Sequence, residues 1–158
     1  MIAPPARTAI LTLASLLLAG AAAAAEPAGS PAHPASVDAL VSAAKRAVTT
    51  IDMRAFRGVV VHPGNALIVD VREPAEYRAG HVPGAVNVPR GLLEFKLWPH
   101  VGGAAHPDYR RRLYVYCGVG SRAALAARTL KTLGFTRVTA VDMRIADWDA
   151  AGYPLDFQ

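Results

Sequence analysis

The sequence predicts an α/β fold in which one parallel sheet is covered by helices. Short apolar runs rich in β-branched residues alternate with segments of helical spacing along the 158 residues, and glycine and proline separate them. Strands that alternate with helices form parallel sheets with helices on both faces. We expect five strands and a single domain without internal repeats, with strands at residues 48–52, 67–71, 85–88, 113–116 and 138–141.

The first 25 residues have the layout of a secretory signal peptide. Arg7 is the only charge before an uncharged stretch at 8–25, which closes on Ala23-Ala24-Ala25, an Ala-x-Ala cleavage motif. A retained membrane anchor is the alternative, but the stretch is short and alanine-rich for a bilayer span, so no stable anchor is expected. Residues 26–35 predict a flexible linker. We therefore expect a periplasmic or secreted protein.

The domain proper is expected at residues 36–158 and begins with a helix over 37–48 that Ser36 caps. After the second strand, Glu73-Pro74-Ala75-Glu76 is typical of a helix start. His81-Val-Pro-Gly84 predicts a β-turn in which Gly84 takes a positive φ, so His81 is expected to be a structural hydrogen bonder rather than a base. The last helix contains Trp148, which we expect in the core.

The only cysteine, Cys117, lies between the strand at 113–116 and an alanine-rich helix at 123–133. In parallel sheets this turn lies at the carboxyl edge, where the amino end of a helix carries a partial positive charge. Gly118 and Gly120 allow backbone N–H groups to curl around the sulfur. Such surroundings favour the thiolate form. The alternative is an inert cysteine buried in the core.

The spacing within the loop indicates which anion it holds. Arg122 follows Cys117 by five positions, whereas cysteine-based phosphatases have a longer loop. The tighter ring suits a single terminal sulfur, as in a persulfide, better than a tetrahedral phosphate. A phosphatase or arsenate reductase is therefore the less favoured alternative.

Two motifs resemble the rhodanese family of sulfurtransferases. They are DVREPAEYRAGHVPGAVNVP from residue 70 and CGVGSR from residue 117, and the resemblance runs from about residue 49 to residue 154. It implies a rhodanese-like five-stranded parallel sheet and a catalytic Cys117 that attacks a thiosulfate-like donor, carries the sulfur as a persulfide and passes it to cyanide or a thiol. The residues implied to bind the persulfide are Gly118, Val119, Gly120, Ser121 and Arg122.

Asp70 and Arg72 match the family's aspartate and arginine at the end of the second strand. The resemblance implies that they support the site rather than react, while for Asp70 a helix cap is an equally good interpretation. Arg90 follows the third strand and either faces the pocket or forms a salt bridge with Glu94.

The sequence departs from the family at two places. Met143-Arg144 stands where a Gly-Gly turn is usual, so larger side chains could narrow the pocket; Arg144 either adds positive charge for the donor or lies on the surface. Gly118 stands where many relatives carry a basic residue, which predicts weaker attraction of thiosulfate.

The formal net charge of +5 favours anionic partners. The run Arg110-Arg111-Arg112 is interpreted as a solvated connection rather than a binding patch, and without aromatic neighbours it does not indicate nucleic acid. The histidines lack the spacing of metal ligands, and we assign no metal and no cofactor. The expected partners are a small anionic sulfur donor and a thiol or cyanide acceptor, with any periplasmic protein partner unidentified. The alternative function is a non-catalytic carrier of sulfane sulfur or a partner-binding module.

Overall fold

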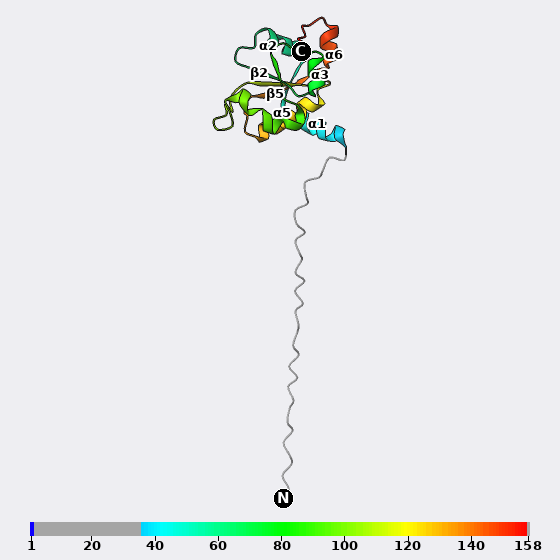
Figure 1. The fold of residues 1–158 in the computed structure, drawn as a ribbon. Coiled ribbons are helices and arrows are strands. Elements are labelled where there is room, and N and C mark those ends of the chain that lie inside the picture. Colours follow the sequence, from blue (N-terminus) through cyan, green and yellow to red (C-terminus); the bar gives the residue numbers. More distant parts are fainter. Residues whose placement is uncertain (2–35, 158) are drawn as a thin grey trace. The chain divides into compact units, whose positions relative to one another are not determined.

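The computed structural model describes Met1 and residues 36–157. Five parallel strands form one sheet in the order β1-β5-β4-β2-β3 (Figure 1). The prediction of a five-stranded parallel sheet is confirmed, and each predicted strand agrees with the observed one to within a residue at either end. The strands are β1 (Thr49–Asp52), β2 (Leu67–Asp70), β3 (Ala85–Asn87), β4 (Leu113–Tyr116) and β5 (Val138–Asp142).

Helices cover both faces of the sheet. Figure 1 shows α1 and α5 on one side of it and α2 and α6 on the other. The α-helices are α1 (Val37–Ala47), α2 (Met53–Val61), α3 (Pro74–Arg78), α4 (Leu93–Lys96), α5 (Ser121–Thr132) and α6 (Ile145–Ala150). Two 3-10 helices, η1 (Arg90–Leu92) and η2 (Trp98–Val101), flank α4.

The core has two layers because successive side chains of a strand point to opposite faces. In β2, Val69 packs with residues of α4 and α5, and Ile68 packs with residues of α2, α3 and α6. Trp148 is fully buried in the second layer, as predicted, and its indole N–H donates to the Pro154 carbonyl at 2.9 Å.

The predicted helix starts are confirmed by their caps. The Ala39 N–H donates to Ser36 Oγ at 3.2 Å at the start of α1. At the start of α3 the N-cap residue is Glu73, whose N–H donates to Glu76 Oε2 at 3.1 Å. Each cap gives a hydrogen-bond acceptor to a backbone N–H group at the start of a helix, where N–H groups lack partners within the helix.

The predicted turn before β3 is also confirmed. The Ala85 N–H donates to the Val82 carbonyl at 3.1 Å, and Gly84 has φ of +73°. His81 is buried, stacks on Tyr77 at 3.7 Å between ring centroids and places Nδ1 3.0 Å from the Tyr77 carbonyl oxygen. This is the structural role predicted for His81.

The strand order places a topological switch point at the carboxyl edge of the sheet between β2 and β4, a place that we call the crevice. From β2 the chain passes through α3 to β3 on one side, and from β4 it passes through α5 to β5 on the other side. The connections therefore diverge at neighbouring strands, which is the position where open α/β sheets bind ligands.

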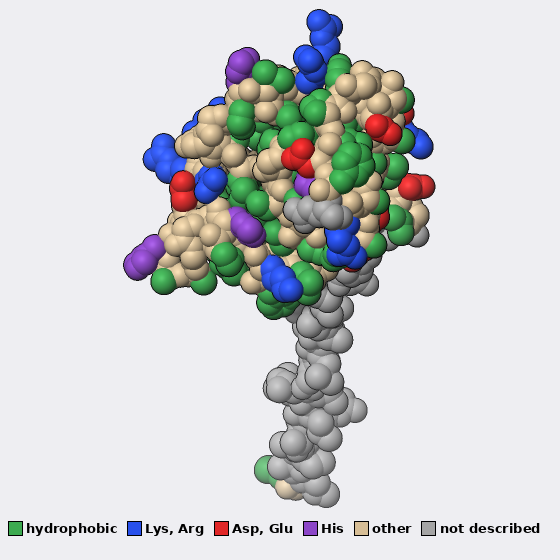
Figure 2. All heavy atoms as spheres, turned by 45° about the horizontal axis from the view of Figure 1, so that its top comes forward, with side chains coloured by type: hydrophobic (Ala, Val, Ile, Leu, Met, Phe, Trp, Pro, Cys, Tyr) green, Lys and Arg blue, Asp and Glu red, His purple; other side chains and the backbone are tan. Residues whose placement is uncertain are grey.

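The expected signal peptide and linker, residues 1–25 and 26–35, lie outside the described residues apart from Met1. Within the described part of the chain, every helix is too short or too polar to cross a bilayer. On the face in Figure 2, the Lys and Arg side chains of the described residues are scattered rather than gathered in one patch.

Candidate active site

Cys117 directly follows β4 and lies at the crevice between β2 and β4. The loop then reaches Gly120, the N-cap of α5, which has φ of +85°. A Cβ at Gly120 would lie 2.6 Å from Asp142 Oδ1, so both the backbone conformation and the available space require glycine. The loop thus turns sharply enough to bring the amino end of α5 close to the cysteine.

Gly118 affects the loop in a different way. Its φ is not positive, but a Cβ there would lie 3.3 Å from Arg122 Nη2. Its carbonyl accepts a hydrogen bond of 3.0 Å from the Ile145 N–H, which holds the loop against the turn after β5. The glycine therefore gives the Arg122 guanidinium room to lie against the loop.

Arg122 forms a bidentate ion pair across the crevice with Glu76 of α3. The Nη1–Oε2 and Nη2–Oε1 distances are both 2.8 Å. The hydrogen bonds from Arg122 hold the pKa of Glu76 at about 2, well below its usual range. The pKa of Arg122 is raised, first by the hydrogen bond to Glu76 and also by the nearby Cys117 sulfur.

Glu76 is the site residue that the sequence did not identify. It was predicted only as an acid in the first turn of α3, near the positive end of the helix dipole. The available signal was its position on a helix that starts at the same sheet edge as the Cys117 loop. Arg122 lies on α5 and Glu76 lies on α3. Their ion pair therefore joins the two sides of the crevice.

Cys117 is 0% exposed, and this burial agrees with the alternative of a cysteine buried in the core. It packs in the core layer with Val71 of the β2–α3 loop and Ala123 of α5. Arg122 and Glu76 pair over the crevice, with side chains that are 35% and 40% exposed. Because the sulfur is buried, a donor reaches it only after the protein around it moves.

Asp70 and Arg72 form a buried ion pair on the other face of the sheet, where their neighbour Ile68 also points. Arg72 Nη2 lies 2.6 Å from Asp70 Oδ2 and also donates to the Gly80 carbonyl at 2.8 Å. The helix-cap alternative for Asp70 is wrong: Asp70 accepts from the Arg72 N–H at 2.9 Å, and the N-cap of α3 is Glu73. The pair holds the loop between β2 and α3, the helix that carries Glu76.

The side chain of Arg90 extends to residues of α4 and α5. It forms the predicted salt bridge with Glu94, at 3.0 Å, and also donates to Thr129 Oγ1 on α5 at 2.9 Å. Arg144 is exposed at the N-cap of α6, in agreement with the surface alternative. Its neighbour Met143 is buried in the α2, α3 and α6 layer of the core. The side chain that was expected to narrow the pocket thus fills the core.

The basic run before β4 is only partly a solvated connection. Arg110 is exposed, but Arg111 is half-buried and donates to the His100 carbonyl at 2.9 Å. Arg112 is also half-buried and lines a cavity at the amino end of the sheet. Among the described residues, no three His, Cys, Asp or Glu side chains are grouped as metal ligands.

The geometry is that of a parallel α/β domain with a lone cysteine on a loop that leads into a helix. The family model for the rhodanese-like domain matches residues 60–151, more than half of the chain. The protein therefore belongs to the rhodanese-like family, and the resemblance inferred from the two motifs is confirmed.

Two curated relatives are similar over most of the domain. A proposed sulfur carrier protein of Bacillus subtilis, YrkF, is 34% identical over 101 residues, which are 64% of this chain and 51% of YrkF. The thiosulfate:glutathione sulfurtransferase of Saccharomyces cerevisiae is 31% identical over 100 residues, 58% of this chain and 70% of the yeast protein. The chain thus spans about half of YrkF.

A solved structure from Rhodopseudomonas palustris, described as a protein of unknown function and possible tyrosine phosphatase, is similar with a TM-score of 0.66. The two are 26% identical, and the match covers 81% of this chain and 100% of the other. The family and its sulfurtransferase relatives support sulfur transfer as the general activity.

Proposed function

We propose that this protein is an exported sulfurtransferase that carries sulfane sulfur on Cys117. The observation on which the proposal rests is the position of the only cysteine, next to the Arg122 guanidinium at the amino end of α5. A guanidinium and a helix amino end both favour negative charge on a sulfur atom. The signal-peptide layout of residues 1–25 supports export.

The proposed reaction has two displacement steps. The Cys117 thiolate attacks the outer sulfur of thiosulfate, a new S–S bond forms, and sulfite leaves with the electron pair of the bond that breaks. Cyanide or a thiolate then attacks the outer sulfur of the persulfide and releases the Cys117 thiolate. Gly118, Val119, Gly120, Ser121 and Arg122 are proposed to bind the terminal sulfur through their N–H groups and the guanidinium charge.

The closed crevice adds a step to this scheme. Because Cys117 is buried, the Arg122–Glu76 pair or the loop must open before a donor enters. Opening exposes a guanidinium that is half-buried in the ion pair, and this cation would then face the anionic donor. We therefore expect binding of the donor and opening of the crevice to be coupled.

The test measures thiocyanate formed from thiosulfate and cyanide by the wild type and by Cys117→Ser. The wild type should turn over many times and the variant not at all, while circular dichroism shows that both are folded. Intact mass spectrometry after incubation with thiosulfate should detect one added sulfur atom, removed by cyanide, in the wild type alone. Transfer by the serine variant would exclude Cys117 from the mechanism.

A second candidate function is a sulfur carrier, which the similarity to YrkF and the buried cysteine both favour. A carrier accepts one sulfur per chain and releases it only to its own partner. Steady thiocyanate production would therefore support the enzyme. A single stoichiometric load that small acceptors do not remove would support the carrier.

A further inference from the structure

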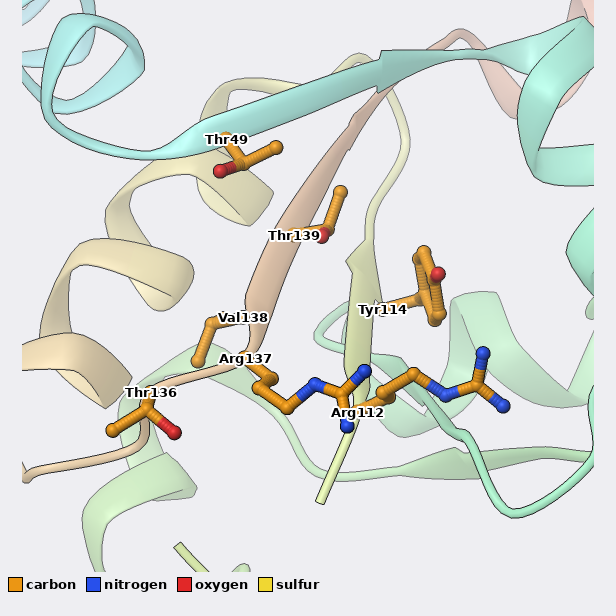
Figure 3. Close-up of a pocket in the computed structure, with 7 residues that line it drawn as sticks. All are labelled: Thr49, Arg112, Tyr114, Thr136, Arg137, Val138 and Thr139. Atoms are coloured by element: carbon orange, nitrogen blue, oxygen red, sulfur yellow. The ribbon is translucent and has the colours of Figure 1, made fainter. Parts of the chain in front are cut away.

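A cavity of about 260 Å³ lies at the amino end of the sheet, on the edge opposite Cys117. Strand β4 connects the two regions, because Arg112 precedes it and Cys117 follows it. Five residues at about 3.3 Å each place them about 16 Å apart. The cavity is lined by Thr49, Arg112, Tyr114, Thr136, Arg137, Val138 and Thr139 (Figure 3).

One wall of the cavity is a row of hydroxyl groups across three neighbouring strands. Thr49 of β1 is in register with Thr139 of β5, and Thr139 is in register with Tyr114 of β4. Figure 3 shows the three side chains above the arginines on adjacent strands. Each hydroxyl can donate a hydrogen bond, so the row offers several donors to one ligand.

The two arginines of the cavity occupy neighbouring positions. The Leu113 N–H donates to the Arg137 carbonyl at 2.9 Å, and Leu113 is in register with Val138, so Arg112 and Arg137 lie side by side at the entrances of β4 and β5. Figure 3 shows their side chains extending in the same direction. Both arginines bring positive charge to this end of the sheet, and the Arg112 guanidinium reaches Pro63 and Asn65.

Few protein groups among the described residues bind these arginines, and Arg137 is exposed to solvent. Arg112 Nη2 contacts the Pro63 carbonyl at 3.5 Å and Asn65 Oδ1 at 3.3 Å, both longer than the usual 2.9–3.0 Å. Within the described part of the chain, neither arginine has a carboxylate within the 4.0 Å that defines an ion pair. No acidic residue is among those lining the cavity.

We propose that this cavity binds a small tetrahedral oxyanion with two negative charges, of the class of sulfate and phosphate. The positive charge of two arginines suits such a ligand, and the hydroxyl row supplies further donors. The volume is just below the range of about 300–1,000 Å³ typical of ligand sites, which favours a small ligand. The inference does not depend on sulfur transfer at Cys117.

The test is a titration of the full chain with sodium phosphate, and separately with sulfate, followed by the backbone amide signals in NMR spectra. The amides of residues 136–139 should shift and saturate. Arg137→Gln should weaken binding by about tenfold, because it removes a charged hydrogen-bonding group. Arg110→Gln is the matched control, since it removes the same charge from an exposed arginine outside the cavity.

Thr139→Val provides a second variant that keeps both the net charge and the side-chain shape. It should weaken binding by a smaller factor than Arg137→Gln. Three outcomes would overturn the proposal: no saturable shift with either anion, shifts confined to residues 117–122, or equal weakening by Arg110→Gln and Arg137→Gln. The last would mean that the anions respond only to overall charge.

Discussion

Replacing Gly120 by alanine tests the geometry of the cysteine loop most directly. At φ of +85° an alanine costs about 1 kcal/mol in backbone strain. Its Cβ would also lie 2.6 Å from Asp142 Oδ1, so this carboxylate must move away from Lys45, which it contacts at 2.8 Å. Both side chains of that pair are partly exposed, and its loss costs up to about 1 kcal/mol. We expect a total of about 2 kcal/mol.

Gly84 provides the matched control. It also has a positive φ, of +73°, but a Cβ there would meet no atom within 4 Å. Gly84→Ala should therefore cost only the backbone strain, about 1 kcal/mol. With a urea m-value of about 2 kcal/mol per molar, the unfolding midpoint should fall by about 1 M for Gly120→Ala and about 0.5 M for Gly84→Ala.

A double variant isolates the contact with Asp142. In an Asp142→Ala background, Gly120→Ala should cost no more than Gly84→Ala does in the wild type, because the carboxylate is gone. Thiosulfate:cyanide transfer should fall in Gly120→Ala and stay unchanged in Gly84→Ala. Equal midpoints for the two glycine variants, or an undiminished cost of Gly120→Ala in the Asp142→Ala background, would refute this account of the loop.

Four further predictions concern the ion pairs and α2. Glu76→Gln should speed the reaction of the Cys117 thiol with a thiol-labelling reagent by up to about fivefold, because the Arg122–Glu76 ion pair is worth up to about 1 kcal/mol. An unchanged labelling rate would contradict this. The pKa of Glu76 is about 2 in the folded protein against 4.5 for the free group, so its ionised form stabilises the fold. This contribution is fully present above about pH 4.5 and is lost as the pH falls through about 2. Urea titrations should therefore show a smaller loss of stability at acid pH in Glu76→Gln than in the wild type. Asp70→Asn should cost about 3 kcal/mol, because Arg72 would stay buried without its counter-charge, and a cost below about 1 kcal/mol would refute that. Gly58→Ala should raise the free energy of unfolding by up to about 1 kcal/mol, because alanine favours a helix more than glycine does. Gly58 is exposed in α2, and the added Cβ would have no atom within 4 Å. A lower melting temperature would contradict this prediction.

Local patterns in the sequence predicted the elements of this domain well. Apolar runs placed the five strands, Ser36 and Pro74 marked helix starts, and Gly84 marked a turn, because each depends on interactions between residues close together in the chain. The loop from Cys117 to Arg122 was recognisable for the same reason: its cysteine, glycines and arginine are contiguous. The sequence left the role of Asp70 open between a support and a helix cap, because Asp70 and Glu73 both precede α3, and the structure gives the cap to Glu73.

The sequence thus established the strands and their alternation with helices, and it identified the residues of one candidate loop, because local spacing encodes all of these. The strand order β1-β5-β4-β2-β3 arises only from packing, and it brings Glu76 to Arg122 across 46 residues of sequence and Arg112 beside Arg137. The burial of Cys117 has the same origin, because the two connections that enclose it, from β2 and from β4, become neighbours only in the folded sheet.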